Sequence, residues 1–345
     1  PERAAVRERH ARRFLAFCEA IEPELTSEHA VEALTRTEAE HDNIRAALDW
    51  SAEHDPAVGL RIGGAIWRFW QQRAHMEEGQ RRIEALMEAA APATDPYALG
   101  RGATAIGGAR YWLGDYLAAG RAYEEAVAHQ RASGDEVALG AALYDLSYPV
   151  AISGDATRAA ALLDEAELLF GRADHAGGEI MVREGRAVQA TIVGDFERAL
   201  ELQRVVVAHH RASGGLFMLS DNIGLEAGLL ARLGRGSEAG PLLEEVREVQ
   251  RQLHDRSSLG GSLEIRALVA VEAGDDETAA LCAGALQGMR DRGATLLPSE
   301  VLGLPDTVAP VRERLGHRFD VLYEAGRAMD PEEVFLTDGL AEQIE

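Results

Sequence analysis

Lysine is absent from this sequence, so all 35 basic residues are arginine. That absence excludes a phosphate-binding P-loop, a Schiff-base lysine and the lysine of protein kinases. Cysteine is almost absent too, because Cys18 and Cys282 are the only two and lie near opposite ends of the chain. They form neither a disulfide framework nor a metal-ligand spacing, which predicts a reduced, cytoplasmic setting.

Long apolar runs and basic patches are also missing. No stretch approaches the ~20 apolar residues of a membrane span, and the first residues lack the apolar core of a signal peptide. The formal charge of -23 predicts a chain that repels phosphate backbones, so we expect no direct nucleic-acid binding and no membrane partner. The chain begins at Pro1 without a methionine, which suggests a piece of a longer protein.

Motifs of catalysis and metal binding are missing as well. The sequence has no HExxH, CxxC or GxSxG, and Gly234, Gly236 and Gly240 lack the preceding strand that a dinucleotide site requires. His209 and His210 point ~100° apart on a helix and make poor joint ligands. We therefore predict no catalytic residue, no cofactor, no metal site and no enzyme in this chain.

What the sequence does contain is a repeat of 40 residues. A glycine recurs at this interval, and an alanine follows it five residues later in every copy. Such columns at this period indicate helical hairpins stacked on one another. The two columns are Gly114, Gly154, Gly194, Gly234 and Gly274, and Ala119, Ala159, Ala199, Ala239 and Ala279.

Each repeat predicts a helix A, a glycine turn and a helix B. Glycine ends helix A because it tolerates a positive φ, and an aspartate after it caps helix B. Another column of small residues, seven positions before the glycine, predicts close contact between the two helices. The caps are Asp115, Asp155, Asp195 and Asp275, and the small column is Gly107, Ser147, Ala187, Ala227 and Ala267.

These features predict an all-α fold, a right-handed α-solenoid of tetratricopeptide-like (TPR-like) hairpins with helical caps at both ends. We place an N-terminal cap or linker at 1–55, about six hairpins at 56–292 and a C-terminal cap at 293–345. The first hairpin, 56–73 and 76–91, has Trp67 and Ala74 where later copies have a small residue and a glycine. In the C-terminal cap we expect helices at 311–315, 319–328 and 331–342, the last one capped by Asp330.

Two flanking stretches resemble a known setting. RHARRFLAFCEA and AEHDNIRAALDW (39–50) near the start, and RERLGHRFDVLYEAGRAMDPEEV (312–334) near the end, resemble the borders of the helical-repeat region in bacterial signal-transduction ATPases. These are the STAND or NB-ARC-type transcriptional regulators of the LuxR and antibiotic-regulatory kind. The resemblance implies an upstream ATPase module and an output domain outside this segment, with the repeats as the sensor arm.

Helix A lines the concave face of TPR stacks, and the 40-residue register predicts which side chains point there. Aromatic residues beside arginines suit an amphipathic peptide or a small ring-bearing ligand, with the arginines holding carboxylate or phosphate. The alternative is that the rings simply pack between adjacent repeats. The candidates are Arg68, Gln72, Arg101, Tyr111, Trp112, Tyr144, Tyr148, Glu184 and Asp221.

The function predicted is therefore a non-enzymatic sensor or protein-interaction arm. Its partner would be a protein, a peptide or a small-molecule inducer, together with the ATPase module of the full-length protein. The alternative is a free-standing TPR adaptor or peptide receptor, and an enzyme is the least favoured hypothesis. Pro149 falls inside a helix A, where it removes a hydrogen bond and is expected to kink or shorten that helix.

Overall fold

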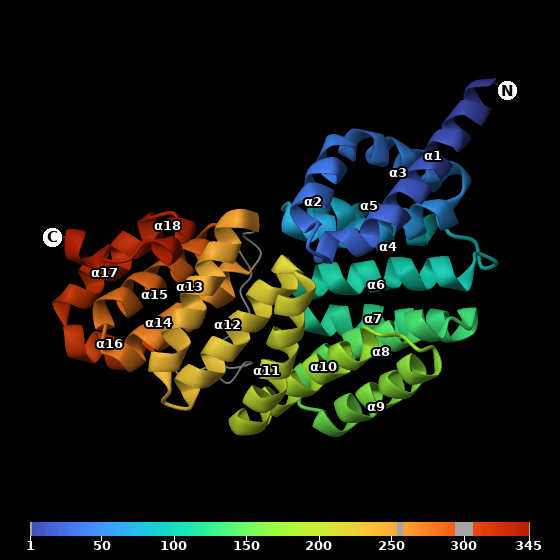
Figure 1. Ribbon diagram of the computed structural model, residues 1–345. Coiled ribbons are helices and arrows are strands. Elements are labelled where there is room, and N and C mark those ends of the chain that lie inside the picture. Colours follow the sequence, from blue (N-terminus) through green and yellow to red (C-terminus); the bar gives the residue numbers. More distant parts are fainter. Residues whose placement is uncertain (1, 254–257, 294–305, 345) are drawn as a thin grey trace. The chain divides into compact units, whose positions relative to one another are not determined.

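The computed structural model describes residues 2–253, 258–293 and 306–344, which form helices joined by turns and short loops, with no strand among them (Figure 1). The chain is an all-α TPR-like solenoid, as predicted. None of its described helices is both long and apolar enough to cross a membrane. The helices are α1 (Glu2–Ile21), α2 (Ala30–Ala39), α3 (His41–His54), α4 (Pro56–Gln72), α5 (Met76–Ala89), α6 (Pro96–Trp112), α7 (Tyr116–Ser133), α8 (Glu136–Ile152), α9 (Ala156–Arg172), α10 (Gly178–Ile192), α11 (Phe196–Ser213), α12 (Leu216–Arg232), α13 (Gly236–Leu253), α14 (Leu259–Ala273), α15 (Asp276–Asp291), α16 (Val308–Leu315), α17 (His317–Ala328) and α18 (Pro331–Leu336).

The helices fall into two compact units. Unit 1 comprises Pro1–Arg186 with Ser213–Gly215, and unit 2 comprises Ala187–Ala212 with Leu216–Glu345. Short 3₁₀ segments, η1 (Glu22–Thr26) and η2 (Ala341–Gln343), lie in unit 1 and unit 2 respectively. The domain boundaries expected from the sequence stay a prediction, and the one at residue 293 adjoins residues outside the described ranges.

The glycine column closes the helix A of each copy as expected. Gly114, Gly154, Gly194, Gly234 and Gly274 all have a positive φ, between +68° and +91°. In the first hairpin the same position is Ala74, with a φ of +59°. A non-glycine residue there is strained, so the turn geometry of the array overrides the preference of alanine.

The aspartates that follow the glycines cap the next helix. The carboxylate of Asp115 accepts a hydrogen bond from the Ala118 N–H at 3.0 Å, and that of Asp155 accepts from Arg158 N–H at 3.0 Å. Asp195 and Asp275 do the same at the start of α11 and α15. Each cap satisfies a backbone donor that has no partner within the helix.

The small columns are buried where helices A and B touch. Ala119, Ala159, Ala199 and Ala239 have no exposed surface. A Cβ atom added to Gly107 of α6 would lie 2.6 Å from the ring of Tyr123 on α7. The contact between the two helices of a hairpin therefore leaves no room for larger side chains.

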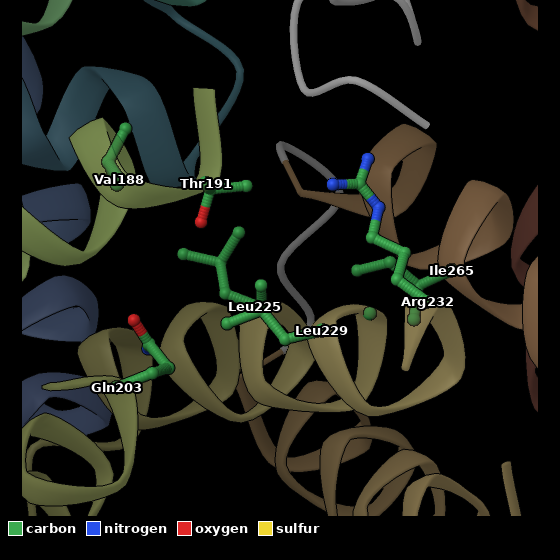
Figure 2. A pocket seen from close by; sticks show the side chains of 8 residues that line it. Val188, Thr191, Gln203, Leu225, Leu229, Arg232 and Ile265 are labelled. Carbon is green, nitrogen blue, oxygen red and sulfur yellow. The ribbon is translucent and has the colours of Figure 1, made fainter. Parts of the chain in front are cut away.

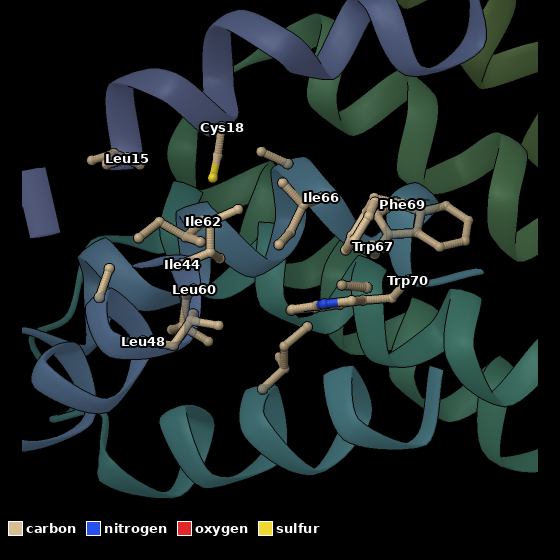
Figure 3. Packing of buried hydrophobic residues seen from close by; sticks show 14 of the residues in the cluster. Leu15, Cys18, Ile44, Leu48, Leu60, Ile62, Ile66, Trp67, Phe69 and Trp70 are labelled. Carbon is tan, nitrogen blue, oxygen red and sulfur yellow. The ribbon is translucent and has the colours of Figure 1, made fainter. Parts of the chain in front are cut away.

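The core of unit 1 is richest where the N-terminal helices meet the first hairpin. Trp70, Phe69 and Ile62 of α4 are almost completely buried, and Ile44 of α3 and Cys18 of α1 pack into the same cluster (Figure 3). Helix α4 contacts α1, α3, α5 and α6. This packing holds the positions of α4 and α6, which carry part of the candidate site.

Pro149 lies within α8 without shortening it. The helix continues for three residues beyond the proline and contains 17 residues, as α6 does. Because proline has no N–H, the carbonyl of Asp145 loses the donor that residue i+4 normally supplies.

The C-terminal cap departs from the prediction at its last helix. Asp330 caps α18 by accepting a hydrogen bond from the Glu332 N–H at 2.9 Å, as expected, but α18 ends at Leu336 and does not reach residue 342. The buried guanidinium of Arg266 donates to the carbonyls of Val334, Phe335 and Thr337. These bonds satisfy the last turn of α18, and the chain then becomes extended.

Candidate functional site

The A helices of unit 1 bring four of the predicted residues together. Tyr111 lies at the end of α6, Tyr144 and Tyr148 lie one turn apart on α8, and Glu184 lies on α10. The spacing of four residues places Tyr144 and Tyr148 on one face of their helix. We call these four residues the tyrosine cluster, and we call the side of α4, α6, α8 and α10 that carries it the A-helix face.

Hydrogen bonds and ring contacts connect the cluster. The hydroxyl groups of Tyr144 and Tyr148 are 2.8 Å apart, and the Tyr144 hydroxyl donates to Oε2 of Glu184 at 3.1 Å. The rings of Tyr144 and Tyr148 meet edge to face at 5.2 Å, and Tyr111 meets Tyr148 in the same way at 6.0 Å. Tyr144 and Glu184 are each 8% exposed, whereas Tyr111 and Tyr148 keep more of their surface in water.

Asp145 adds a carboxylate beside the cluster. Its side chain is partly exposed, yet desolvation raises its pKa to about 7. Arg68 lowers this pKa and Glu184 raises it, but both effects are smaller than that of burial. Burial also raises the pKa of the Tyr144 and Tyr148 hydroxyls well above 10, so neither phenol ionises near neutral pH.

Arg68 is the cation whose charge lowers the pKa of Asp145. Its guanidinium stacks 3.9 Å from the ring centroid of Trp67, and it donates to the side-chain oxygen of Gln71 at 2.9 Å. It forms no ion pair with any residue in the described ranges. These contacts hold Arg68 on α4 without neutralising Asp145.

Three other predicted residues have structural partners elsewhere. Gln72 is buried and donates to the carbonyl of Leu25 at 3.3 Å. Arg101 pairs with Glu22 at 2.5 Å, so its charge is already neutralised. Trp112 packs against the core of unit 1, in agreement with the alternative that some aromatic residues are simply structural.

Asp221 belongs to unit 2, where it lies partly exposed on α12. That unit contains a small pocket between the A helices α10, α12 and α14 and the B helix α11 (Figure 2). The cavity volume is about 40 Å³, which suits the tip of one side chain and is far below the ~300 Å³ of a typical small-molecule site. Its lining consists of Val188, Thr191, Gln203, Leu225, Gly228, Leu229, Arg232 and Ile265.

The pocket and the tyrosine cluster occupy the same positions of the repeat. In the 40-residue register, Val188 and Gly228 are equivalent to Tyr148, and Leu225 and Ile265 are equivalent to Asp145. The positions that line a recess in unit 2 therefore carry tyrosine and aspartate in unit 1. These equivalent positions on this face therefore carry apolar residues in unit 2 and polar or aromatic residues on α8 of unit 1.

Asp145 was missed by reasoning from the sequence, although a signal for it exists. Its register equivalents are Ala105, Gly185, Leu225 and Ile265, all small or apolar. A single carboxylate in such a column is a departure from the structural pattern. The predicted list includes the carboxylates Glu184 and Asp221 but not this position.

One cluster has a composition suited to metal ligands. Glu38, His41 and His75 place one candidate atom each within 4.8 Å of one another. However, the indole N–H of Trp70 donates to Nε2 of His41 at 3.2 Å. A neutral imidazole that accepts at Nε2 carries its proton on Nδ1, so Nδ1 presents a donor and no lone pair. This arrangement does not fit a metal ion.

Comparison with known proteins gives structural neighbours only. No family model matches the sequence, and no curated protein matches it. A Rap protein in complex with competence and sporulation factor has a TM-score of 0.56 at 13% identity, over 99% of this chain and 100% of its own. The Rap conjugation gene regulator of plasmid pLS20, in complex with the Phr* peptide, has a TM-score of 0.55 at 12% identity, over 97% and 95%. NprR in complex with its cognate peptide NprX has a TM-score of 0.51 at 11% identity, over 92% and 97%.

At these identities the likeness establishes the fold. The chain is similar to TPR-like helical-repeat proteins over almost its whole length, and no catalytic family is indicated. The fold presents helix faces for binding partners.

Proposed function

We propose that this chain is a peptide- or protein-binding sensor arm and that its occupant docks on the A-helix face of unit 1. The tyrosine cluster is the observation that carries the proposal. Tyr111 and Tyr148 are partly exposed. The Tyr148 hydroxyl is hydrogen-bonded to that of Tyr144, which donates to Glu184, and Tyr111 contacts the ring of Tyr148 edge to face. Rigid aromatic rings with polar tips are favoured residues for binding surfaces.

The structural neighbours support a peptide as the occupant. Three neighbours with this fold were solved with a bound partner, namely competence and sporulation factor, the Phr* peptide and the cognate peptide NprX, and the likeness runs along nearly the full length of each. The small pocket of unit 2 is in keeping with this class of ligand, because its volume of about 40 Å³ fits a side chain and not a whole metabolite.

The wider setting follows from the resemblance of the flanking sequences. In this proposal the repeats act in the cytoplasm, receive a peptide, a protein or a small inducer, and control an ATPase module of a transcriptional regulator. The chain itself supplies no catalysis and holds no cofactor. A free-standing peptide receptor is the second candidate, since the likeness to Rap proteins spans almost the whole of both chains.

Selection of peptides from a random 12-residue display library against the purified chain tests the proposal. We expect selected peptides to bind with an affinity that falls at least tenfold in Tyr111→Ala, because a partly exposed ring is removed from the surface. Leu117→Ala is the matched control, since Leu117 is 75% exposed on the B helix α7. Circular dichroism verifies that both variants fold. Failure to select any peptide, or equal binding by the two variants, would contradict the proposal.

A further inference from the structure

The charges around the tyrosine cluster define the chemistry of its occupant more narrowly. The sequence alone favoured an anionic ligand held by arginines. Of the two predicted arginines on this side of unit 1, Arg101 is paired with Glu22 and Arg68 is held by Trp67 and Gln71. The carboxylate of Asp145, in contrast, has no hydrogen-bond or ion-pair partner among the described residues.

The Asp145 carboxylate lacks both kinds of partner. Within the described ranges no donor lies within hydrogen-bonding distance of its carboxylate, and no cation lies within ion-pairing distance. Glu184 is a second carboxylate whose charge reaches Asp145. Pro149 also deprives the Asp145 carbonyl of its helical donor. An unpaired carboxylate in a desolvated position is costly unless a partner supplies a positive charge.

The neighbouring rings favour the same kind of partner. Tyr144, Tyr148 and Tyr111 contact one another edge to face, and the faces of aromatic rings attract cations. Because burial keeps the phenols of Tyr144 and Tyr148 neutral, they add a negative ring face and a hydroxyl dipole without a charge of their own.

We propose that the peptide bound on the A-helix face places a cationic group against the partly exposed tyrosines, Tyr111 and Tyr148, and pairs it with Asp145. This inference rests on the proposed function and specifies its ligand class. The cation is either an arginine or lysine side chain or the α-amino group of the peptide, since both donate several hydrogen bonds to a carboxylate. Glu184 adds a second negative charge, so the two carboxylates together disfavour peptides with an acidic residue at the same point.

A mutant cycle on peptides from the 12-residue display library tests the inference. Each selected peptide is synthesised with its basic residues changed to glutamine, and separately with its amino terminus acetylated. On the unaltered chain we expect one of these changes to lower the affinity at least tenfold. On Asp145→Asn the same change should lower it less than threefold, because the carboxylate that it addressed is gone.

Glu125→Gln is the control for net charge. Glu125 is exposed on the B helix α7, and its substitution removes one negative charge without touching the A-helix face. The peptide effects should be unchanged in this variant. A basic-residue effect of equal size in Asp145→Asn and in the unaltered chain would overturn the inference.

The dependence of binding on pH gives a second readout. The groups around Asp145 are Arg68 on α4, Tyr111 on α6, Tyr123 on α7, Tyr144 and Tyr148 on its own helix, and Glu184 on α10. Because a cation binds the ionised carboxylate, affinity should fall by up to tenfold per pH unit below about 7. In Asp145→Asn this fall should disappear, and its persistence would contradict the inference.

The outcomes separate this inference from the proposed function. Selected peptides that carry no effective cationic group would overturn the inference and leave the peptide-binding function standing. If the library yields no binding peptide at all, both are overturned.

Discussion

At the scale of single residues, Asp145 links binding to stability. Burial raises its pKa to about 7, whereas an aspartate in an unfolded chain titrates near 3.8. Between these values the native state keeps a proton that the unfolded chain has lost, so this group lowers the free energy of unfolding as pH rises from about 4 to about 7. Above pH 7 its contribution is constant.

Replacing Asp145 by asparagine should therefore stabilise the protein at alkaline pH. We expect the free energy of unfolding to rise by on the order of 2 kcal/mol at pH 8, because a desolvated charge is removed. At pH 4 the variant and the unaltered chain should differ little, since Asp145 is then neutral in the native state and only about half ionised in the unfolded chain. Urea denaturation at the two pH values measures this, and an equal gain at both would show that the charge is not the cause.

Residues also mark where prediction from sequence succeeds and where it stops. The conformation of Gly154 followed from its place in a column, because a turn between helices needs a positive φ. The partners of Gln72 and Arg101 could not be foreseen, because Leu25 and Glu22 come from η1, and the register of the repeat says nothing about a segment that lies outside it.

At the scale of elements, the contact between helices A and B tolerates little added volume. Ala159 of α9 has no exposed surface, while Ala161 on the same helix is exposed. We expect Ala159→Leu to lower the free energy of unfolding by ~1–3 kcal/mol through overpacking, and to lower the melting temperature by a few degrees. Thermal unfolding followed by circular dichroism provides the measurement.

Ala161→Leu is the matched control, with the same change in side chain and helix propensity. It should leave the melting temperature nearly unchanged. If both variants melt alike, Ala159 does not sit at the close contact that the repeat predicts.

The ends of most elements were predictable because turn and cap chemistry is local. α4 and α5 begin at Pro56 and Met76, as the register required. The end of α18 was not predictable, because it depends on Arg266 of α14, which lies 68 to 71 positions from the carbonyls of Val334, Phe335 and Thr337 that it binds. A tertiary contact of this kind does not appear as a repeating pattern in the sequence.

At the scale of the whole molecule, the two cysteines report separately on the two units. Cys18 lies in unit 1 and Cys282 in unit 2, and both thiols are buried. Burial raises the pKa of both, that of Cys282 to about 11. Since the thiolate is the reactive form, neither should react with a thiol reagent in the native protein.

Repeat arrays are stabilised by contacts between neighbours, so distant parts need not unfold together. We therefore expect the single-thiol variants Cys18→Ser and Cys282→Ser to become reactive at different urea concentrations, each reporting the unfolding of the unit that keeps its thiol. Pulsed labelling followed by mass spectrometry measures the two midpoints, with circular dichroism of both variants as the control for matched overall stability. Coincident midpoints would mean that the 345 residues unfold as one cooperative body. In that case a peptide bound to unit 1 would stabilise unit 2 by the same amount. If the midpoints are separate, the peptide should raise only the midpoint reported by Cys18, which lies in unit 1.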